Sequence, residues 1–191
     1  MADVVHDVAR HAALGPGTLV LVVGPSGAGK DTLLAYARAR LRRPEVLFAR
    51  RRITRTPDGT EDHERLSPAE FESGVASGAF ALHWRANGLG YALGSEVAAA
   101  VRSGRPVVAN GSRAAVTEAR QRFADVRVVL VSAPPAVLAA RLAARGRESG
   151  AALSERLARV PALDEAPDLA VLNDGAVEQA GERLVAYLAA L

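Results

Sequence analysis

The chain has 191 residues and a formal net charge of only +3, so a strongly basic partner surface for nucleic acid is not indicated. It contains no Cys, which excludes a disulfide framework, a thiolate metal site and a thiol enzyme. Polar residues interrupt the first ten positions and no stretch approaches the roughly 18 apolar residues of a membrane span, so we expect one cytoplasmic domain.

Buried strands alternate with helices along most of the chain, which predicts an α/β fold. The aliphatic run at 18–23 is typical of a strand covered on both faces of a parallel sheet, and a helix is expected from about 30 to 42. Further strands are predicted at 105–109, 126–131 and 169–172, followed by helices at 113–123, 135–144 and 177–191. This order predicts a parallel sheet with helices on both faces.

The segment from about 49 to 93 differs from the rest because it is more polar and contains the only Trp. Within it, Ser67-Pro68-Ala69-Glu70 is a capping box with Pro at the first helical position, which predicts a helix over 68–75. We expect this segment to form a small inserted lobe, on a core made from about 1–48 and 94–191. A basic stretch at about 141–150 is expected to form a lid.

The most specific motif is Gly24-Pro25-Ser26-Gly27-Ala28-Gly29-Lys30, a Walker A pattern. It follows a predicted strand and opens a predicted helix, where backbone amides and the helix N-terminus bind phosphate. Lys30 is the only Lys among 24 basic residues, which indicates a task that a guanidinium does not perform. These seven residues, together with Asp31, Thr32 and Asn173, are the predicted ATP-binding residues, with Asn173 bordering the adenine.

The position after Lys30 departs from the usual pattern, because Asp31 stands where Ser or Thr normally places a hydroxyl on Mg²⁺. No predicted strand ends in an acid of the Walker B type: the strand at 105–109 runs into Asn110. A carboxylate can bind Mg²⁺ directly or through water. We therefore expect the metal to be held by the nucleotide phosphates, water, Asp31 and Thr32.

Several classes of phosphate-loop protein do not fit this sequence. The Asn-Lys-x-Asp pattern of a GTPase is missing, and 191 residues leave little room for a motor. A small-molecule kinase remains, whose second substrate would be a phosphorylated compound held by arginines of the lobe. In a strand, Arg51 would face the opposite side from Arg50 and Arg52, so only one side of this run can face the acceptor.

The motifs Ile-Thr-Arg-Thr-Pro at 53–57, Gly78-x-Phe80, Trp84 and Gly90-Tyr91 resemble those of guanylate kinases. The resemblance covers nearly the whole chain. It implies that Arg55, His63 and Tyr91 hold the acceptor phosphate. It also implies that His83 and the segment 110–112 stand where guanylate kinases place the carboxylates that bind guanine.

A closer resemblance is to ribose 1,5-bisphosphate phosphokinases, carried by Gly-Lys-Asp-Thr-Leu-Leu at 29–34, Glu-Asp-His at 61–63, the strings at 66–71 and 78–84, and Ala-Asn-Gly-Ser-Arg at 109–113. It implies transfer of the γ-phosphoryl group of ATP to the carbon-1 phosphate of ribose 1,5-bisphosphate. The expected acceptor-binding residues are Arg51, Arg55, His63, His83, Tyr91, Asn110 and Ser112. The expected catalytic residues are Lys30, Arg55 and the lid arginines Arg141 and Arg145, with Arg147 as a further lid candidate.

Two alternatives stay open from the sequence. One is a nucleoside monophosphate kinase, and the other is a catalytically silent guanylate-kinase-like binding module. The expected partner is a small phosphorylated sugar, with no nucleic acid and no membrane, and a homodimer is left open.

Overall fold

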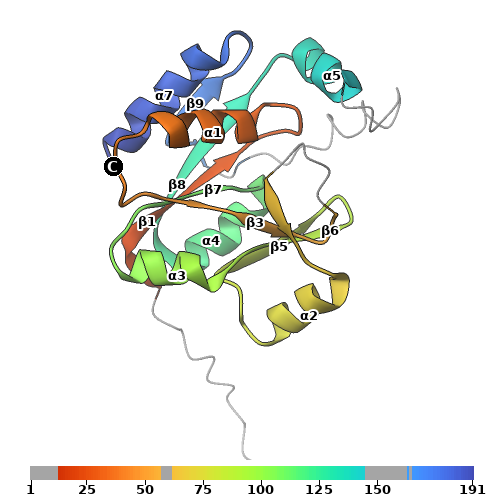
Figure 1. Ribbon diagram of the computed structural model, residues 1–191, viewed down its shortest axis with the longest axis vertical. Helices are drawn as coiled ribbons and strands as arrows, with labels where there is room; N and C mark the ends of the chain where they lie inside the picture. Colours follow the sequence, from red (N-terminus) through yellow and green to blue (C-terminus); the bar gives the residue numbers. More distant parts are fainter. Residues whose placement is uncertain (1–12, 57–61, 145–162, 164) are drawn as a thin grey trace, which may run out of the picture.

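The computed structural model describes residues 13–56, 62–144, 163 and 165–191, which form two sheets with flanking helices (Figure 1). The larger sheet has five strands in the order β2-β7-β1-β8-β9, and every pairing within it is parallel. Its strands are β1 (Leu14–Val23), β2 (Leu47–Ala49), β7 (Val107–Asn110), β8 (Phe123–Ser132) and β9 (Leu169–Leu172). The predicted parallel α/β fold is confirmed.

The central strand β1 is buried on both faces, and its alternating side chains enter two separate cores. Leu19 and Leu21 pack with α3 (Ser95–Arg102) and α4 (Val116–Arg122), while Val20 and Val22 pack with α1 (Lys30–Arg40) and α7 (Val177–Ala189). Figure 1 shows these helix pairs on opposite sides of the sheet. This double burial explains why the strand is aliphatic at every position from 19 to 23.

The smaller sheet has the strand order β4-β3-β6-β5 and comes from the segment between the core strands β2 and β7. Its strands are β3 (Arg51–Ile53), β4 (His63–Arg65), β5 (Leu82–Ala86) and β6 (Leu89–Leu93). Asn87 and Gly88 join β5 to β6 with φ angles of 51° and 72°, the left-handed conformation of a tight hairpin turn.

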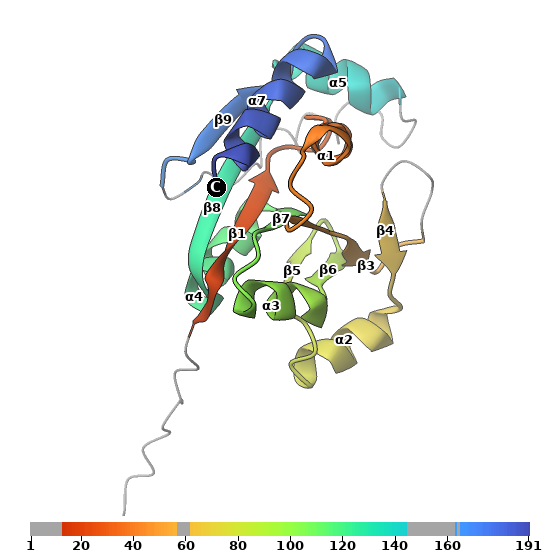
Figure 2. The same cartoon turned by 60° about the vertical axis from the view of Figure 1, so that its left-hand side comes forward.

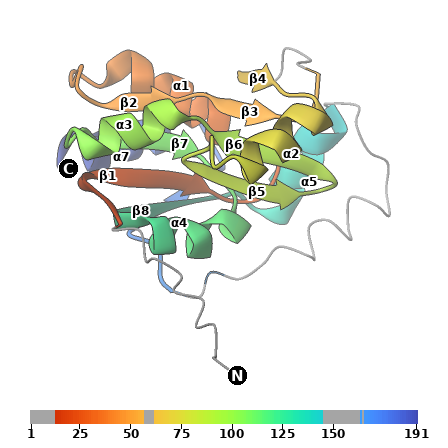
Figure 3. The ribbon, with the colours of Figure 1, turned by 90° about the horizontal axis from the view of Figure 1, so that it is seen from below.

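Helix α2 (Pro68–Ala76) covers one face of this smaller sheet through Phe71, which packs with Phe80 and Ala92. Figure 3 shows α2 alongside β5 and β6, and Figure 2 shows it at the outer side of the sheet, away from α1. The opposite face is therefore the one directed towards the larger sheet.

The predicted capping box at the start of α2 is confirmed. The Ser67 hydroxyl accepts a hydrogen bond from the Glu70 amide at 3.2 Å, and the Glu70 carboxylate accepts one from the Ser67 amide at 2.6 Å. The box satisfies two of the amide groups that a helix leaves unpaired at its start.

Most predicted elements are found with ends shifted by a few residues, but one helix was missed and another begins differently. Helix α3 was not predicted: its N-cap is Gly94, which offers no side-chain hydrogen bond, so no start signal marks it in the sequence. The helix expected at 113–123 begins as a 3₁₀ turn, η1 (Arg113–Ala115), and ends at Arg122, because Phe123 is already extended as the first residue of β8. Helix α5 (Pro135–Ala144) has the bounds that were predicted for it. Within the described residues, no helix is long and apolar enough to span a bilayer.

Replacing Ser67 with Ala should lower the free energy of unfolding by about 1 kcal/mol, because one end of the capping box is lost. Chemical denaturation of the parent and the variant measures this. Ser77→Ala is the matched control, since Ser77 lies at the other end of α2 and its hydroxyl bonds the Ser73 carbonyl. Equal losses in both variants would contradict a specific contribution of the capping box.

Candidate active site

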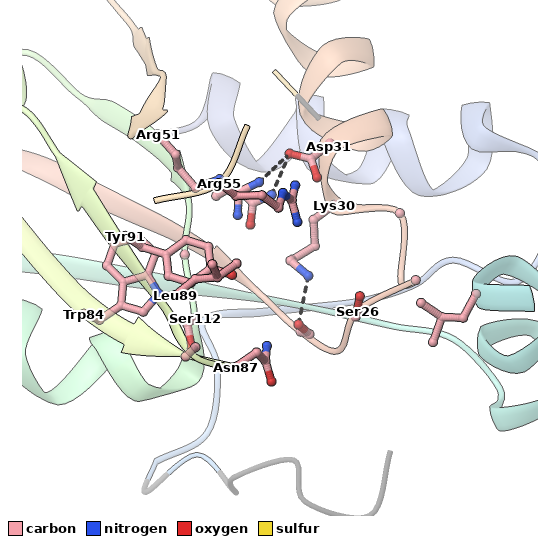
Figure 4. A pocket seen from close by; sticks show the side chains of 17 residues that line it. Ser26, Lys30, Asp31, Arg51, Arg55, Trp84, Asn87, Leu89, Tyr91 and Ser112 are labelled. Carbon is pink, nitrogen blue, oxygen red and sulfur yellow. Dashed lines mark hydrogen bonds and ion pairs between the residues drawn. The ribbon is translucent and has the colours of Figure 1, made fainter. Parts of the chain in front are cut away.

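A cavity of about 480 Å³ lies where β1 and β7 end, between the phosphate loop and the inner face of the smaller sheet. Figure 4 shows its side chains converging from both sheets and from the start of α1. It is lined by Gly24, Ser26, Gly27, Gly29, Lys30, Asp31, Arg51, Arg55, Trp84, Ala86, Asn87, Leu89, Tyr91, Asn110, Gly111, Ser112 and Leu142. The structure thus brings together most residues that were predicted from separate motifs.

The phosphate loop is tightly enclosed at its two ends. Gly24 has a φ of 147°, and a Cβ there would lie 2.0 Å from the backbone oxygen of Val131 on β8. Gly29 is the left-handed N-cap of α1, and a Cβ there would lie 2.3 Å from Nδ2 of Asn173. Both positions therefore require Gly for backbone geometry and for space.

Lys30 begins α1 and its side chain lies over the loop (Figure 4). Its ammonium donates hydrogen bonds to the carbonyls of Gly24 at 2.9 Å and Pro25 at 3.0 Å. The helix N-terminus and this ammonium place positive charge at the same end of the cavity, as anion binding requires.

Asn173 and Arg141 lie behind the loop and are absent from the cavity lining. The Asn173 side chain is 5% exposed and donates to the Ala28 carbonyl at 2.7 Å. Arg141 of α5 donates to the carbonyls of Asn173 at 3.0 Å and Gly27 at 3.4 Å. The structure therefore makes both Asn173 and Arg141 supports of the loop, and a contact of Asn173 with the adenine stays a prediction. Arg145, Arg147 and most of the expected lid lie outside the described residues.

Asp31 lies one residue into α1 and links the two sheets. Its Oδ1 accepts a hydrogen bond from Asn110 at the end of β7 at 2.7 Å and from Arg51 of β3 at 3.1 Å. Thr32 is exposed on α1 and does not line the cavity, so only one of the two expected metal ligands reaches it. The described residues contain no group of three or more His, Asp or Glu that could hold a metal by themselves.

The predicted alternation of the three arginines is observed. Arg51 is 7% exposed and faces the cavity, while Arg52 points to the other side and pairs with Glu64 at 3.0 Å and Glu96 at 3.3 Å. Arg55, two residues beyond β3, also lines the cavity. The smaller sheet therefore directs two guanidinium groups towards the phosphate loop.

An aromatic pair forms the far wall of the cavity. The rings of Trp84 and Tyr91 lie opposite each other on β5 and β6 and stack with centroids 5.4 Å apart at an interplanar angle of 5°. Tyr91 was a predicted contact. Trp84 was not among the predicted contacts, and the structure shows that it is both 6% exposed and part of the lining.

The two histidines expected at the acceptor do not line the cavity. His63 is 1% exposed, and its Nε2 lies 3.2 Å from the Arg55 carbonyl, so it fixes the backbone that carries Arg55. Strand alternation places His83 and Trp84 on different faces of β5, so His83 faces α2. Its ring contacts that of Phe71 edge to face, with centroids 6.2 Å apart. Burial, followed by the positive charge of Arg122, lowers the pKa of His83.

Comparisons with known proteins identify a family model, related sequences and a similar solved structure. The family described as an AAA domain matches residues 19–163. Two relatives named ribose 1,5-bisphosphate phosphokinase PhnN are similar to this chain over most of both sequences. The one from Methylobacterium radiotolerans is 51% identical over 92% of this chain and 99% of its own, and the one from Bradyrhizobium diazoefficiens is 48% identical over 91% and 88%.

Among solved structures, guanylate kinase from Anaplasma phagocytophilum shares the fold with a TM-score of 0.67, covering 92% of this chain and 86% of that one. The sequence identity of 16% limits this comparison to the fold.

Asn173→Ala should lower the free energy of unfolding by about 1 to 3 kcal/mol and raise the KM for ATP, because the buried Ala28 carbonyl loses its donor. Thermal unfolding and initial rates measure the two effects. Asp174→Ala, a change at the exposed neighbouring residue, is the control. An unchanged KM for ATP in Asn173→Ala would show that the amide does not shape the loop.

Since the pKa of His83 is lowered in the folded protein, the unfolded chain binds the additional proton first. His83 should therefore reduce stability as the pH falls below about 6.5, its ordinary pKa. His83→Gln is expected to flatten the melting temperature between pH 7 and 5 and to leave the acceptor KM unchanged. A rise of about tenfold in that KM would instead place His83 in the acceptor site.

Proposed function

The chain belongs to the ribose 1,5-bisphosphate phosphokinase PhnN family, and we propose that it transfers the γ-phosphoryl group of ATP to the carbon-1 phosphate of ribose 1,5-bisphosphate. The products would be 5-phosphoribosyl 1-diphosphate and ADP. The cavity between the phosphate loop and the smaller sheet is the proposed place of transfer.

The observation that carries this proposal is the charge of the cavity lining. Among the described residues it contains three basic side chains, Lys30, Arg51 and Arg55, and a single carboxylate, Asp31. That carboxylate is already hydrogen-bonded to Arg51 and Asn110. A site with this excess of positive charge suits two phosphorylated substrates that must approach each other.

On the donor side, the proposed ligands of the ATP phosphates are the loop amides from Gly24 to Gly29 and the ammonium of Lys30. Mg²⁺ fits this site, because Asp31 provides the oxygen ligand type that the ion prefers and the nucleotide phosphates provide others. When bound, Mg²⁺ supplies positive charge to the β- and γ-phosphates. Arg141 and Asn173 act in this proposal by keeping the loop in shape.

On the acceptor side, Arg51 and Arg55 are the proposed phosphate ligands, and the hydroxyls of Tyr91 and Ser112 are the proposed partners of the ribose. The attacking group is a phosphate oxygen that is already ionised near neutral pH. No general base is therefore needed, and catalysis consists of positioning the two phosphates and neutralising their charge.

The same lining disfavours the nucleotide alternative. Guanine presents hydrogen-bond donors at N1 and N2, which call for carboxylate acceptors. Asp31 is the one acid in the described lining and one of its oxygens already bonds Arg51 and Asn110, while His83 faces α2. Each unpaired buried donor would cost about 1 to 3 kcal/mol, or roughly one to two orders of magnitude in affinity.

Ribose 1,5-bisphosphate should be the better acceptor, with a kcat/KM at least about tenfold higher than that of GMP at equal ATP and Mg²⁺. A coupled assay of ADP release with ribose 1,5-bisphosphate, ribose 5-phosphate and GMP measures this. Lys30→Ala is the control for contaminating kinases and should lose several orders of magnitude in turnover while keeping its melting temperature. A comparable kcat/KM for GMP would favour the nucleoside monophosphate kinase, and ADP release at the Lys30→Ala level would favour the silent module.

A further inference from the structure

The acidic side chain near the phosphate loop, Asp31, lies on the helix and not at the end of a strand, where phosphate-loop proteins usually have it. The strand end carries Asn110 instead. In the usual arrangement a hydroxyl follows the loop Lys and an acid comes from a strand, and together they hold Mg²⁺. Here the acid follows Lys30 on α1, and the neutral amide of Asn110 ends β7, directly beside β1. The two side chains touch, with Asn110 Nδ2 donating to Asp31 Oδ1 at 2.7 Å.

The orientation of the Asn110 amide follows from this contact. An ionised carboxylate only accepts hydrogen bonds, so the NH₂ group of Asn110 must face Asp31 and its Oδ1 must face the other way. Asn110 is 4% exposed, and this buried Oδ1 has no hydrogen-bond partner within the described part of the chain. Asn110 as a residue lines the cavity, so a donor for this oxygen would have to come from a bound ligand or from water.

Arg51 completes the arrangement from the smaller sheet. Its side chain is 9% exposed and donates to the same Oδ1 atom at 3.1 Å, whereas the Asp31 side chain is 34% exposed. Both contacts therefore hold the Oδ1 atom of Asp31, and neither of them uses Oδ2. A carboxylate whose one oxygen is fixed by neighbours is a well-oriented metal ligand.

We propose that Asp31 would supply, from α1, the carboxylate that other phosphate-loop kinases take from a strand, and that Asn110 is the positioning residue that orients it through its hydrogen bond to Oδ1. The proposal rests on the proposed use of Mg²⁺ and ATP, but it is independent of the acceptor. It predicts that exchanging both side chains preserves metal binding, whereas replacing either one alone weakens it.

An exchange of the two residues tests this directly, because Asp31→Asn/Asn110→Asp keeps the same two side chains and swaps their positions. Electron paramagnetic resonance of free Mn²⁺ gives the Kd of Mn²⁺ for the complex with saturating ADP. Asp31→Asn should raise this Kd about tenfold, and the exchanged double variant should return to within about threefold of the parent. Asp125→Asn, the same change at the distant end of the sheet beside Thr18, should match the parent.

Melting temperatures show whether each variant is folded. If the double variant does not fold, Asn110→Ala, which removes only the amide, must still raise the Kd for Mn²⁺ about tenfold. The proposal is overturned if Asp31→Asn binds Mn²⁺ as the parent does, if a folded double variant binds no more tightly than Asp31→Asn, or if Asn110→Ala has no effect. No acceptor is present in these titrations, so a failed acceptor assignment leaves their result unchanged.

Discussion

The carboxylate of Asp31 is the contact on which the arrangement of the site depends. Asp31 is the second residue of α1, next to the phosphate loop. One of its oxygens accepts hydrogen bonds from both Asn110 of the larger sheet and Arg51 of the smaller sheet. A guanidinium as deeply buried as Arg51 requires a partner, since an unpaired buried charge is strongly unfavourable. The pairing therefore places the inner face of the smaller sheet over the end of β1, where the phosphates are expected.

The loop itself is held by contacts that leave little room for movement. Gly24 lies against the backbone of β8, and from behind the loop Asn173 donates to the Ala28 carbonyl and Arg141 to the Gly27 carbonyl. Binding phosphate with backbone amides works only if those amides are already oriented, since ordering the loop at each binding event would reduce affinity. The polar side chains behind the loop thus support the backbone that is proposed to bind phosphate, although they do not reach the cavity.

Features that depend only on residues close together in the sequence could be predicted from the sequence. The Walker A pattern, the capping box at Ser67 and the alternation that separates Arg51 from Arg52 all follow from neighbouring residues, and each is found in the structure. The turn at Asn87-Gly88 carried an equally clear hairpin signal, which could have defined β5 and β6 and with them the Trp84 and Tyr91 wall. Helix α3 lacked such a signal, because Gly94 provides no cap.

Roles that depend on tertiary contacts could not be assigned in this way. Asn173 reaches Ala28 across 145 positions, so no spacing rule connects them. His83 was placed at the acceptor by its position in a family motif, although the alternation from Leu82 to Trp84 already separates it from the face that Trp84 occupies.

The claim that the carbon-1 phosphate is the acceptor is tested most directly by ³¹P nuclear magnetic resonance of the reaction products. The account predicts two new coupled phosphorus signals for a diphosphate on carbon 1, an unchanged signal for the carbon-5 monophosphate, and an equal amount of ADP. A diphosphate on carbon 5, or ADP accompanied only by inorganic phosphate, would contradict it.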